Sequence, residues 1–163
     1  MSSFDALAAL HRHGVEFIVI GAFSAVAQGY PLPTQDVDVT PSRDPVNLER
    51  LAAALSELGA ELRLPGGRTH PFPIEPRYLG NSDSWRLATT AGDLDILFRP
   101  SGTSGFDDLR RDALELTLRG TPVLCASLRD IIRMKEASNR PKDQAQIPAL
   151  RRTLELRREL EGR

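Results

Sequence analysis

The most informative part of the sequence is residues 18–40, which read IVIGAFSAVAQGYPLPTQDVDVT. Residues 15–20 are a short apolar run with β-branched side chains, which predicts a strand. From Gly21 onward the apolar spacing is that of a helix, and Gly29 ends it. A strand is therefore predicted to run directly into a helix through a turn at Gly21.

The segment after this helix is an acidic strand. In QDVDV the valines alternate with polar residues, so Asp36 and Asp38 are predicted to share one face. Two carboxylates this close repel each other unless a cation lies between them. Mg²⁺ prefers carboxylate, phosphate and water oxygens as ligands. The pair therefore predicts a Mg²⁺ site, although aspartates at strand ends also commonly cap turns or face solvent.

A second acidic strand is predicted in GDLDILF, residues 92–98. Leu94 and Ile96 are expected to face the core, which places Asp93 and Asp95 together on the other face. Asp95, between two core residues, is predicted to complete a site of three carboxylates. The alternative is a polar strand face exposed to water, which is ordinary in an antiparallel sheet.

The turn between the first strand and its helix has the features of a phosphate site. A helix N-terminus presents free backbone N–H groups, and phosphate binds well there. Gly21 permits the tight turn, and Ser24 offers a hydroxyl close by. We therefore predict nucleotide contacts at Gly21 and Ser24. A purely structural turn, in which Ser24 only starts the helix, explains the same residues.

The remaining elements predict an α+β fold with a mixed β-sheet, helices on one side and a helical C-terminus. Residues 1–126 are expected to form the core and residues 127–163 a helical subdomain packed on it, within one domain. Residues 65–84 are expected to be a long loop that either covers a substrate or packs structurally. The expected helices are residues 3–13, residues 45–58, a segment capped by Ser127, and a last helix after residues 140–143. The expected hairpins pair residues 85–90 with 93–98 and residues 114–118 with 122–125.

The composition excludes several classes of protein. The chain has 163 residues, a formal net charge of −1 and one cysteine, Cys125. Near-neutral charge excludes the global basic surface of a dedicated nucleic-acid-binding domain. A single cysteine excludes an internal disulfide and a cysteine-based zinc cluster. No apolar segment approaches the roughly 20 residues that span a membrane, so we expect a cytoplasmic protein without membrane contact.

Four segments in order resemble nucleotidyltransferase-fold proteins, particularly toxins of the AbiEii and MenT type. They are VIGAFSAVAQG, QDVDV, GDLDILF and MKEASNRPKD, and the resemblance covers most of the chain. It implies the polymerase beta-like nucleotidyltransferase fold. It also implies that the turn at Gly21 holds nucleotide phosphates, that Asp36 and Asp38 bind divalent metal, and that Asp95 completes the catalytic site.

The same resemblance implies a role for a lysine and an acid beyond the sheet. Here these residues are Lys135, predicted to be catalytic and nucleotide-binding, and Asp143, predicted to be nucleotide-binding. For Lys135 a surface lysine on an amphipathic helix is the alternative, and Asp143 can instead pair with Arg140. Ala22 departs from the family pattern at the second position of the glycine turn.

The resemblance implies nucleotidyl transfer with Mg²⁺ in a two-metal site and a nucleoside triphosphate as substrate. The implied acceptor is the 3′ end of tRNA, as for a toxin controlled by a cognate antitoxin. From Arg129 onward basic residues outnumber acidic ones, which is the local feature that suits a tRNA backbone. Two alternatives remain: transfer to a small molecule such as an aminoglycoside, and a catalytically inactive, binding-only role.

Overall fold

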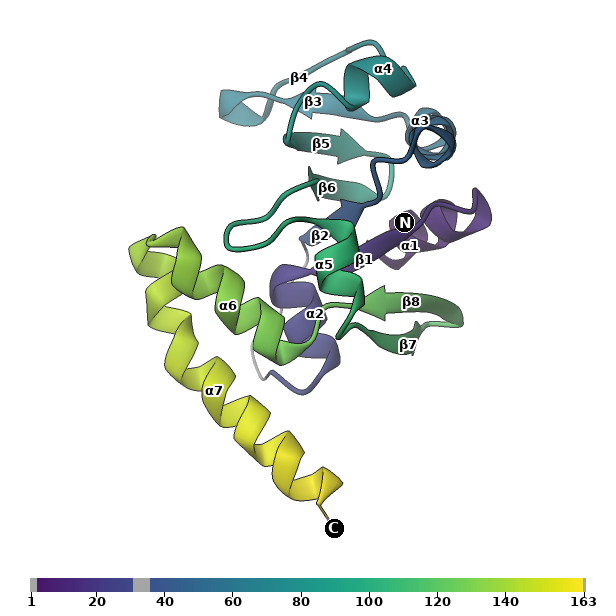
Figure 1. The fold of residues 1–163 in the computed structure, drawn as a ribbon. Coiled ribbons are helices and arrows are strands. Elements are labelled where there is room, and N and C mark those ends of the chain that lie inside the picture. Colours follow the sequence, from purple (N-terminus) through teal and green to yellow (C-terminus); the bar gives the residue numbers. More distant parts are fainter. Residues whose placement is uncertain (1–2, 31–35, 163) are drawn as a thin grey trace.

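A computed structural model describes residues 3–30 and 36–162 of the chain. In these residues one mixed sheet has the strand order β4-β3-β5-β6-β2-β1-β8-β7, as Figure 1 shows. The strands are β1 Phe17–Ile20, β2 Val37–Pro41, β3 Glu61–Arg63, β4 Thr69–His70, β5 Ser84–Thr89, β6 Gly92–Leu97, β7 Leu114–Leu118 and β8 Thr121–Cys125. The helices are α1 Ser3–Arg12, α2 Gly21–Ala27, α3 Pro45–Glu57, α4 Pro76–Leu79, α5 Phe106–Arg110, α6 Leu128–Ser138 and α7 Pro141–Glu161, with a 3₁₀ turn η1 at Pro65–Gly67.

The centre of the sheet joins the two acidic strands. Strand β2 pairs antiparallel with β1 and parallel with β6. In the parallel pair Asp38 lies directly opposite Asp95. Residues opposite each other on paired strands point to the same face, so the pairing brings together carboxylates that are far apart in the sequence.

Helices cover both faces of the sheet, which corrects the expectation of helices on one side. Along β1, Val19 packs in a core with residues of α1 and α3, whereas Ile18 and Ile20 pack in a second core with residues of α5, α6 and α7. Successive side chains of a strand point to opposite faces, so a continuous apolar run such as FIVI requires cover on both sides. In Figure 1, α1 and α3 lie on one side of the sheet and α5 and α6 on the other.

The two predicted hairpins are present. Strand β5 pairs antiparallel with β6, and β7 pairs antiparallel with β8 through a turn at Arg119 and Gly120, both with positive φ. The segment expected as a long loop contains η1, β4 and α4. Phe72 stacks on Trp85 with 5.5 Å between ring centroids, and Leu79 is fully buried. This segment is therefore packed structure at the edge of the sheet.

The last two helices belong to the second core. Ile131 and Met134 of α6 and Ile147 and Leu150 of α7 are buried in the same cluster as Ile18 of β1. The second half of α7 extends away from the sheet in Figure 1, and Leu160 there is 67% exposed. Among the described helices, none combines the length and apolarity needed to cross a membrane.

Candidate active site

A cleft of about 410 Å³ opens between the middle of the sheet and helices α6 and α7. Its walls bring together six of the seven predicted site residues: Gly21, Asp36, Asp38, Asp95, Lys135 and Asp143. They come from the start of α2, from β2 and the residue before it, from β6 and from both C-terminal helices. Segments distant in the sequence thus converge on one concave surface, which is the usual arrangement of an active site.

Gly21 lies in contact with the acidic strands. Its φ is +70°, a conformation that glycine adopts without strain. A Cβ atom at this position would lie 2.6 Å from Oδ2 of Asp38. Both the backbone conformation and the space beside the Asp38 carboxylate therefore require glycine.

Asp38 is the carboxyl group of the cleft whose pKa is strongly raised. Burial raises its pKa to about 6, and the negative charges of Asp95 and Asp36 add to this effect, while Lys135 opposes it. Part of the carboxylate charge is therefore uncompensated within the protein. Such a group favours a proton at acidic pH and a cation at neutral pH.

Asp95 has a partner that sequence reasoning missed. Nη1 of Arg63 lies 2.7 Å from Oδ1 of Asp95 and also donates to the carbonyl of Leu87 at 3.1 Å. Nε of the same guanidinium lies 3.7 Å from Oδ2 of Asp93. Arg63 comes from β3 and reaches across β5, so no local sequence signal connects it with Asp95.

The donor chemistry of the cleft fits a divalent cation at Asp36 and Asp38. Among the described residues no group of three acidic, histidine or cysteine side chains is arranged to hold a metal ion, and Asp95 is paired with Arg63. The pKa of Asp38, raised by burial and by its neighbouring carboxylates, is nevertheless the perturbation that a bound cation relieves. Metal ligation by Asp36, Asp38 and Asp95 stays a prediction.

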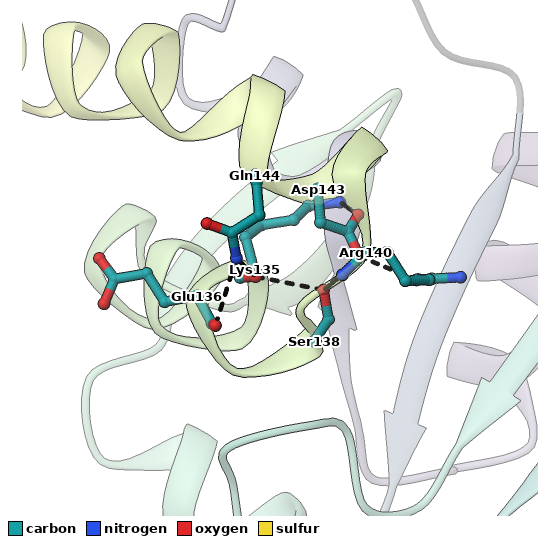
Figure 2. A network of polar contacts seen from close by, with 6 residues as sticks. All are labelled: Lys135, Glu136, Ser138, Arg140, Asp143 and Gln144. Carbon is teal, nitrogen blue, oxygen red and sulfur yellow. Dashed lines mark hydrogen bonds and ion pairs between the residues drawn. The ribbon is translucent and has the colours of Figure 1, made fainter.

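The opposite wall of the cleft is a polar network centred on Asp143, shown in Figure 2. Nζ of Lys135 lies 3.0 Å from Oδ1 of Asp143, and Oδ2 accepts from the Ser138 hydroxyl and from Nε of Arg140 at 3.0 Å. The Asp143 side chain is only 5% exposed. Burial by itself raises its pKa, but the hydrogen bonds from Ser138, Lys135 and Arg140 and the charge of Lys135 outweigh burial and lower it to about 2.

Both carboxylate oxygens of Asp143 are thus used inside the protein. This arrangement leaves Asp143 ionised at neutral pH and ties the end of α6 to the start of α7. Lys135 is 19% exposed at the cleft and lies close enough to lower the pKa of Asp38. Lys135 is therefore the cation of this wall that faces the carboxylates, and Asp143 is the group that holds it.

Ser24 lies outside the cleft. It is fully buried, and its hydroxyl donates to the carbonyl of Ala126 at 2.9 Å, where Gln28 also donates at 2.7 Å. This hydroxyl holds α2 against the junction of β8 and α6 and does not point toward the predicted phosphate position. The side chain of Ala22 lies outside the part of the structure that is described.

Comparison with solved structures identifies the fold. The lincosamide antibiotic adenylyltransferase LnuA, with lincomycin bound, has a TM-score of 0.58 at 14% identity, over 91% of this chain and 93% of that one. ANT(2")-Ia in complex with adenylyl-2"-tobramycin has a TM-score of 0.54 at 18% identity, over 91% and 83%. No protein-family model and no curated protein matches the sequence. The chain thus has the predicted nucleotidyltransferase fold, while the narrower likeness to AbiEii and MenT toxins stays a prediction.

Proposed function

We propose that the protein is a nucleotidyltransferase, which moves a nucleoside monophosphate from a nucleoside triphosphate to an acceptor hydroxyl. The observation that carries this proposal is the cleft, in which Asp36, Asp38 and Asp95 face Lys135. The nucleotidyltransferase fold supports it. A new bond forms between the acceptor oxygen and the α-phosphorus, the bridging bond to the β-phosphate breaks, pyrophosphate leaves, and the hydroxyl proton passes to solvent.

The chain's own residues bind and orient the nucleotide. The backbone at the start of α2 offers N–H groups to phosphate. Gly21, which has no side chain, leaves room beside them for the Asp38 carboxylate. Lys135, held by Asp143, offers positive charge to the triphosphate. Asp36 and Asp38, with Asp95 as the predicted third ligand, would hold Mg²⁺, which when bound stabilises the attacking and leaving oxygens.

The direct test is transfer of α-labelled nucleotides, one base at a time with Mg²⁺, onto total tRNA, total protein and small molecules. We expect Asp38→Ala to lose at least about a hundredfold in rate, since the interactions that stabilise a transition state supply several kcal/mol. Asp107→Ala, an exposed position on α5 outside the cleft, is the matched control and should keep full activity. Full activity of Asp38→Ala would reject this site.

For the acceptor, the 3′ end of tRNA is the first candidate, and with it a toxin regulated by an antitoxin. Arg151, Arg152 and Arg158 are exposed on α7, although Arg151 pairs with Glu136. Replacing Arg151 and Arg152 with glutamate should weaken tRNA binding and reduce its salt dependence, because each phosphate contact releases counterions. Unchanged binding would remove this helix from consideration.

A small-molecule acceptor is the second candidate. It is favoured by the two antibiotic-bound structures with the same fold. The transfer assay with lincomycin and tobramycin as acceptors separates this candidate from tRNA. The third candidate is a catalytically inactive protein that acts only by binding a partner. Such a protein would bind neither Mg²⁺ nor nucleotide.

A further inference from the structure

Arg86 is a cation of the cleft that the site described above does not use. It lies on β5 directly opposite Asp95 of β6, so its side chain is on the same face as that carboxylate, and it lines the cleft. It is exposed, and with the residues that the structure describes it forms no ion pair and no side-chain hydrogen bond. A guanidinium remains charged at all physiological pH values, so this charge is available to a ligand.

The elements that carry Arg86 and Lys135 lie on opposite sides of the two acidic strands. The sheet order places β6 and β2, which carry Asp95 and Asp38, between β5 on one side and β1 on the other. Helix α6, which carries Lys135, packs on β1 through Ile131. Figure 1 shows the same sequence of elements, with β5 beyond β6 and α6 on the far side of β2.

The chemistry of the proposed reaction gives these two sides different roles. In phosphoryl transfer the attacking and leaving oxygens lie roughly in line, on opposite sides of the phosphorus. The leaving pyrophosphate is expected near Lys135 and Lys142, which line the cleft at α6 and α7. The acceptor hydroxyl must then approach from the side of β5.

We propose that Arg86 binds a phosphate group of the acceptor, next to the hydroxyl that is modified. The inference rests on the proposed nucleotidyl transfer and adds the chemical class of the acceptor. Arg63 cannot take this role because it already pairs with Asp95 and lies near Asp93. A phosphate can accept two parallel hydrogen bonds from a guanidinium, whereas an ammonium group of a polycationic acceptor has no oxygen to accept them.

Two sources of such a phosphate are a nucleic-acid 3′ end and a phosphorylated metabolite. The test measures binding of the dinucleotide CpA and of ribose 5-phosphate to the full chain, with Mg²⁺ and α,β-methylene analogues of the four nucleoside triphosphates present. Adenosine and ribose are the matched uncharged probes, and a polycationic aminoglycoside is the competing class. Arg86→Gln, Arg86→Lys and the control Arg77→Gln, an exposed position on α4 away from the cleft, are compared with the unchanged protein.

We expect Arg86→Gln to weaken binding of one phosphate-bearing probe at least tenfold, and the affected probe identifies the source. Arg86→Lys should retain part of the affinity, and Arg77→Gln all of it. Affinity for the triphosphate analogue should stay within twofold in every variant. Equal probe binding by Arg86→Gln and the unchanged protein, or binding of the aminoglycoside in place of both phosphate probes, would overturn the assignment of Arg86.

Failure of the nucleotidyltransferase proposal has a separate signature. In that case the unchanged protein binds none of the triphosphate analogues, a measurement that does not involve Arg86. The assignment of Arg86 to the acceptor is then wrong together with the proposed nucleotidyl transfer. If the analogues bind and Arg86 has no effect, only the acceptor assignment is wrong.

Discussion

At the scale of single residues, Gly21 and Asp38 are in contact, and the position of each restricts the other. The glycine leaves space for the carboxylate, and the carboxylate lies where any side chain at position 21 would be. The backbone at Gly21 also has a positive φ, which disfavours other residues. A substitution here therefore disturbs the acidic strand as well as the turn.

We expect Gly21→Ala to lose activity and stability together. The new Cβ would lie 2.6 Å from Oδ2 of Asp38, so the carboxylate or the turn must move, and the left-handed backbone adds about 1 kcal/mol of strain. Steady-state kinetics and thermal unfolding measure the two effects. Gly120→Ala is the matched control, because Gly120 also has positive φ but has open space around it. It should lower stability and leave kcat unchanged.

The raised pKa of Asp38 predicts that its ionised carboxylate destabilises the folded protein at neutral pH. Its pKa is about 6 in the folded chain, above the usual carboxyl value, so the folded state holds the proton more tightly than the unfolded one. Stability contributed by this group is present at low pH and is lost as the pH rises through about 6. Asp38→Asn should therefore raise the unfolding temperature at pH 7.5, with a smaller difference at pH 4.

Mg²⁺ provides the control for this prediction. If Asp38 is a metal ligand, Mg²⁺ should raise the unfolding temperature of the unchanged protein at pH 7.5 and leave that of Asp38→Asn unaffected. Asp38→Asn should at the same time lose nucleotidyl transfer. A lower unfolding temperature for Asp38→Asn at pH 7.5 would contradict the pKa argument.

At the scale of elements, the junction of α6 and α7 determines where Lys135 lies. Asp143 accepts hydrogen bonds from Lys135, Ser138 and Arg140, so the turn between the helices is held by one carboxylate. Gly102, in the turn that follows β6, lies against the same helix, since a Cβ there would lie 2.8 Å from that of Ala137. The position of the cleft lysine thus depends on contacts from two directions.

Asp143→Asn should destabilise the protein and raise the KM for the nucleotide. Removing one partner of a nearly buried ion pair costs up to about 3 kcal/mol because Lys135 is left uncompensated. The pKa of Asp143 is lowered to about 2, so its stabilising effect is present above about pH 4 and is lost as the pH falls toward 2. Unfolding measured from pH 7 to pH 2.5 should show the variant and the unchanged protein converging.

Arg140→Gln is the comparison for Asp143→Asn, because it removes only the exposed partner of the same carboxylate. The Arg140 side chain is 70% exposed, and exposed ion pairs contribute little. If Arg140→Gln lowers the free energy of unfolding as much as Asp143→Asn does, the network does not depend on the ion pair between Lys135 and Asp143.

At the scale of the whole molecule, the C-terminal helices complete the second core. Leu128, Ile131 and Leu150 are at most 2% exposed and pack with Ile18 and Ile20 of β1. Each fully buried apolar side chain stabilises a fold by about 1.5–3 kcal/mol, and total stabilities are about 5–15 kcal/mol. We therefore expect the core of residues 1–126 and the helical subdomain of residues 127–163 to fold together, as parts of the single domain that the sequence predicts.

We predict that residues 1–126 alone will not form a stable native state, whereas residues 1–155 will. The shorter chain exposes the face of β1 that α6 and α7 cover, while the longer one keeps every buried residue of α7. Circular dichroism and amide exchange of the two fragments are the measurements. A cooperative thermal transition in residues 1–126 would show that the core is self-sufficient.

Much of this architecture follows from local patterns in the sequence. Alternation in QDVDV and GDLDILF predicts both acidic strands, and Gly21 predicts the turn, because side-chain periodicity and backbone freedom depend on neighbouring residues alone. The hairpins and both C-terminal helices follow from the same kind of signal. The order of the acidic strands, the two hairpins and the C-terminal helices, and the choice of cleft carboxylates, were therefore accessible before the structure. Strand β3 and helices α4 and α5 were not predicted.

Long-range pairing was not accessible in this way. The parallel register of β2 and β6 places Asp38 opposite Asp95, Arg63 reaches across a strand to Asp95, and the Ser24 hydroxyl faces inward to Ala126. No local sequence pattern predicts these contacts, because each joins residues that are brought together by packing of the whole sheet. Periodicity specifies which face a side chain occupies, and tertiary packing specifies what lies against it.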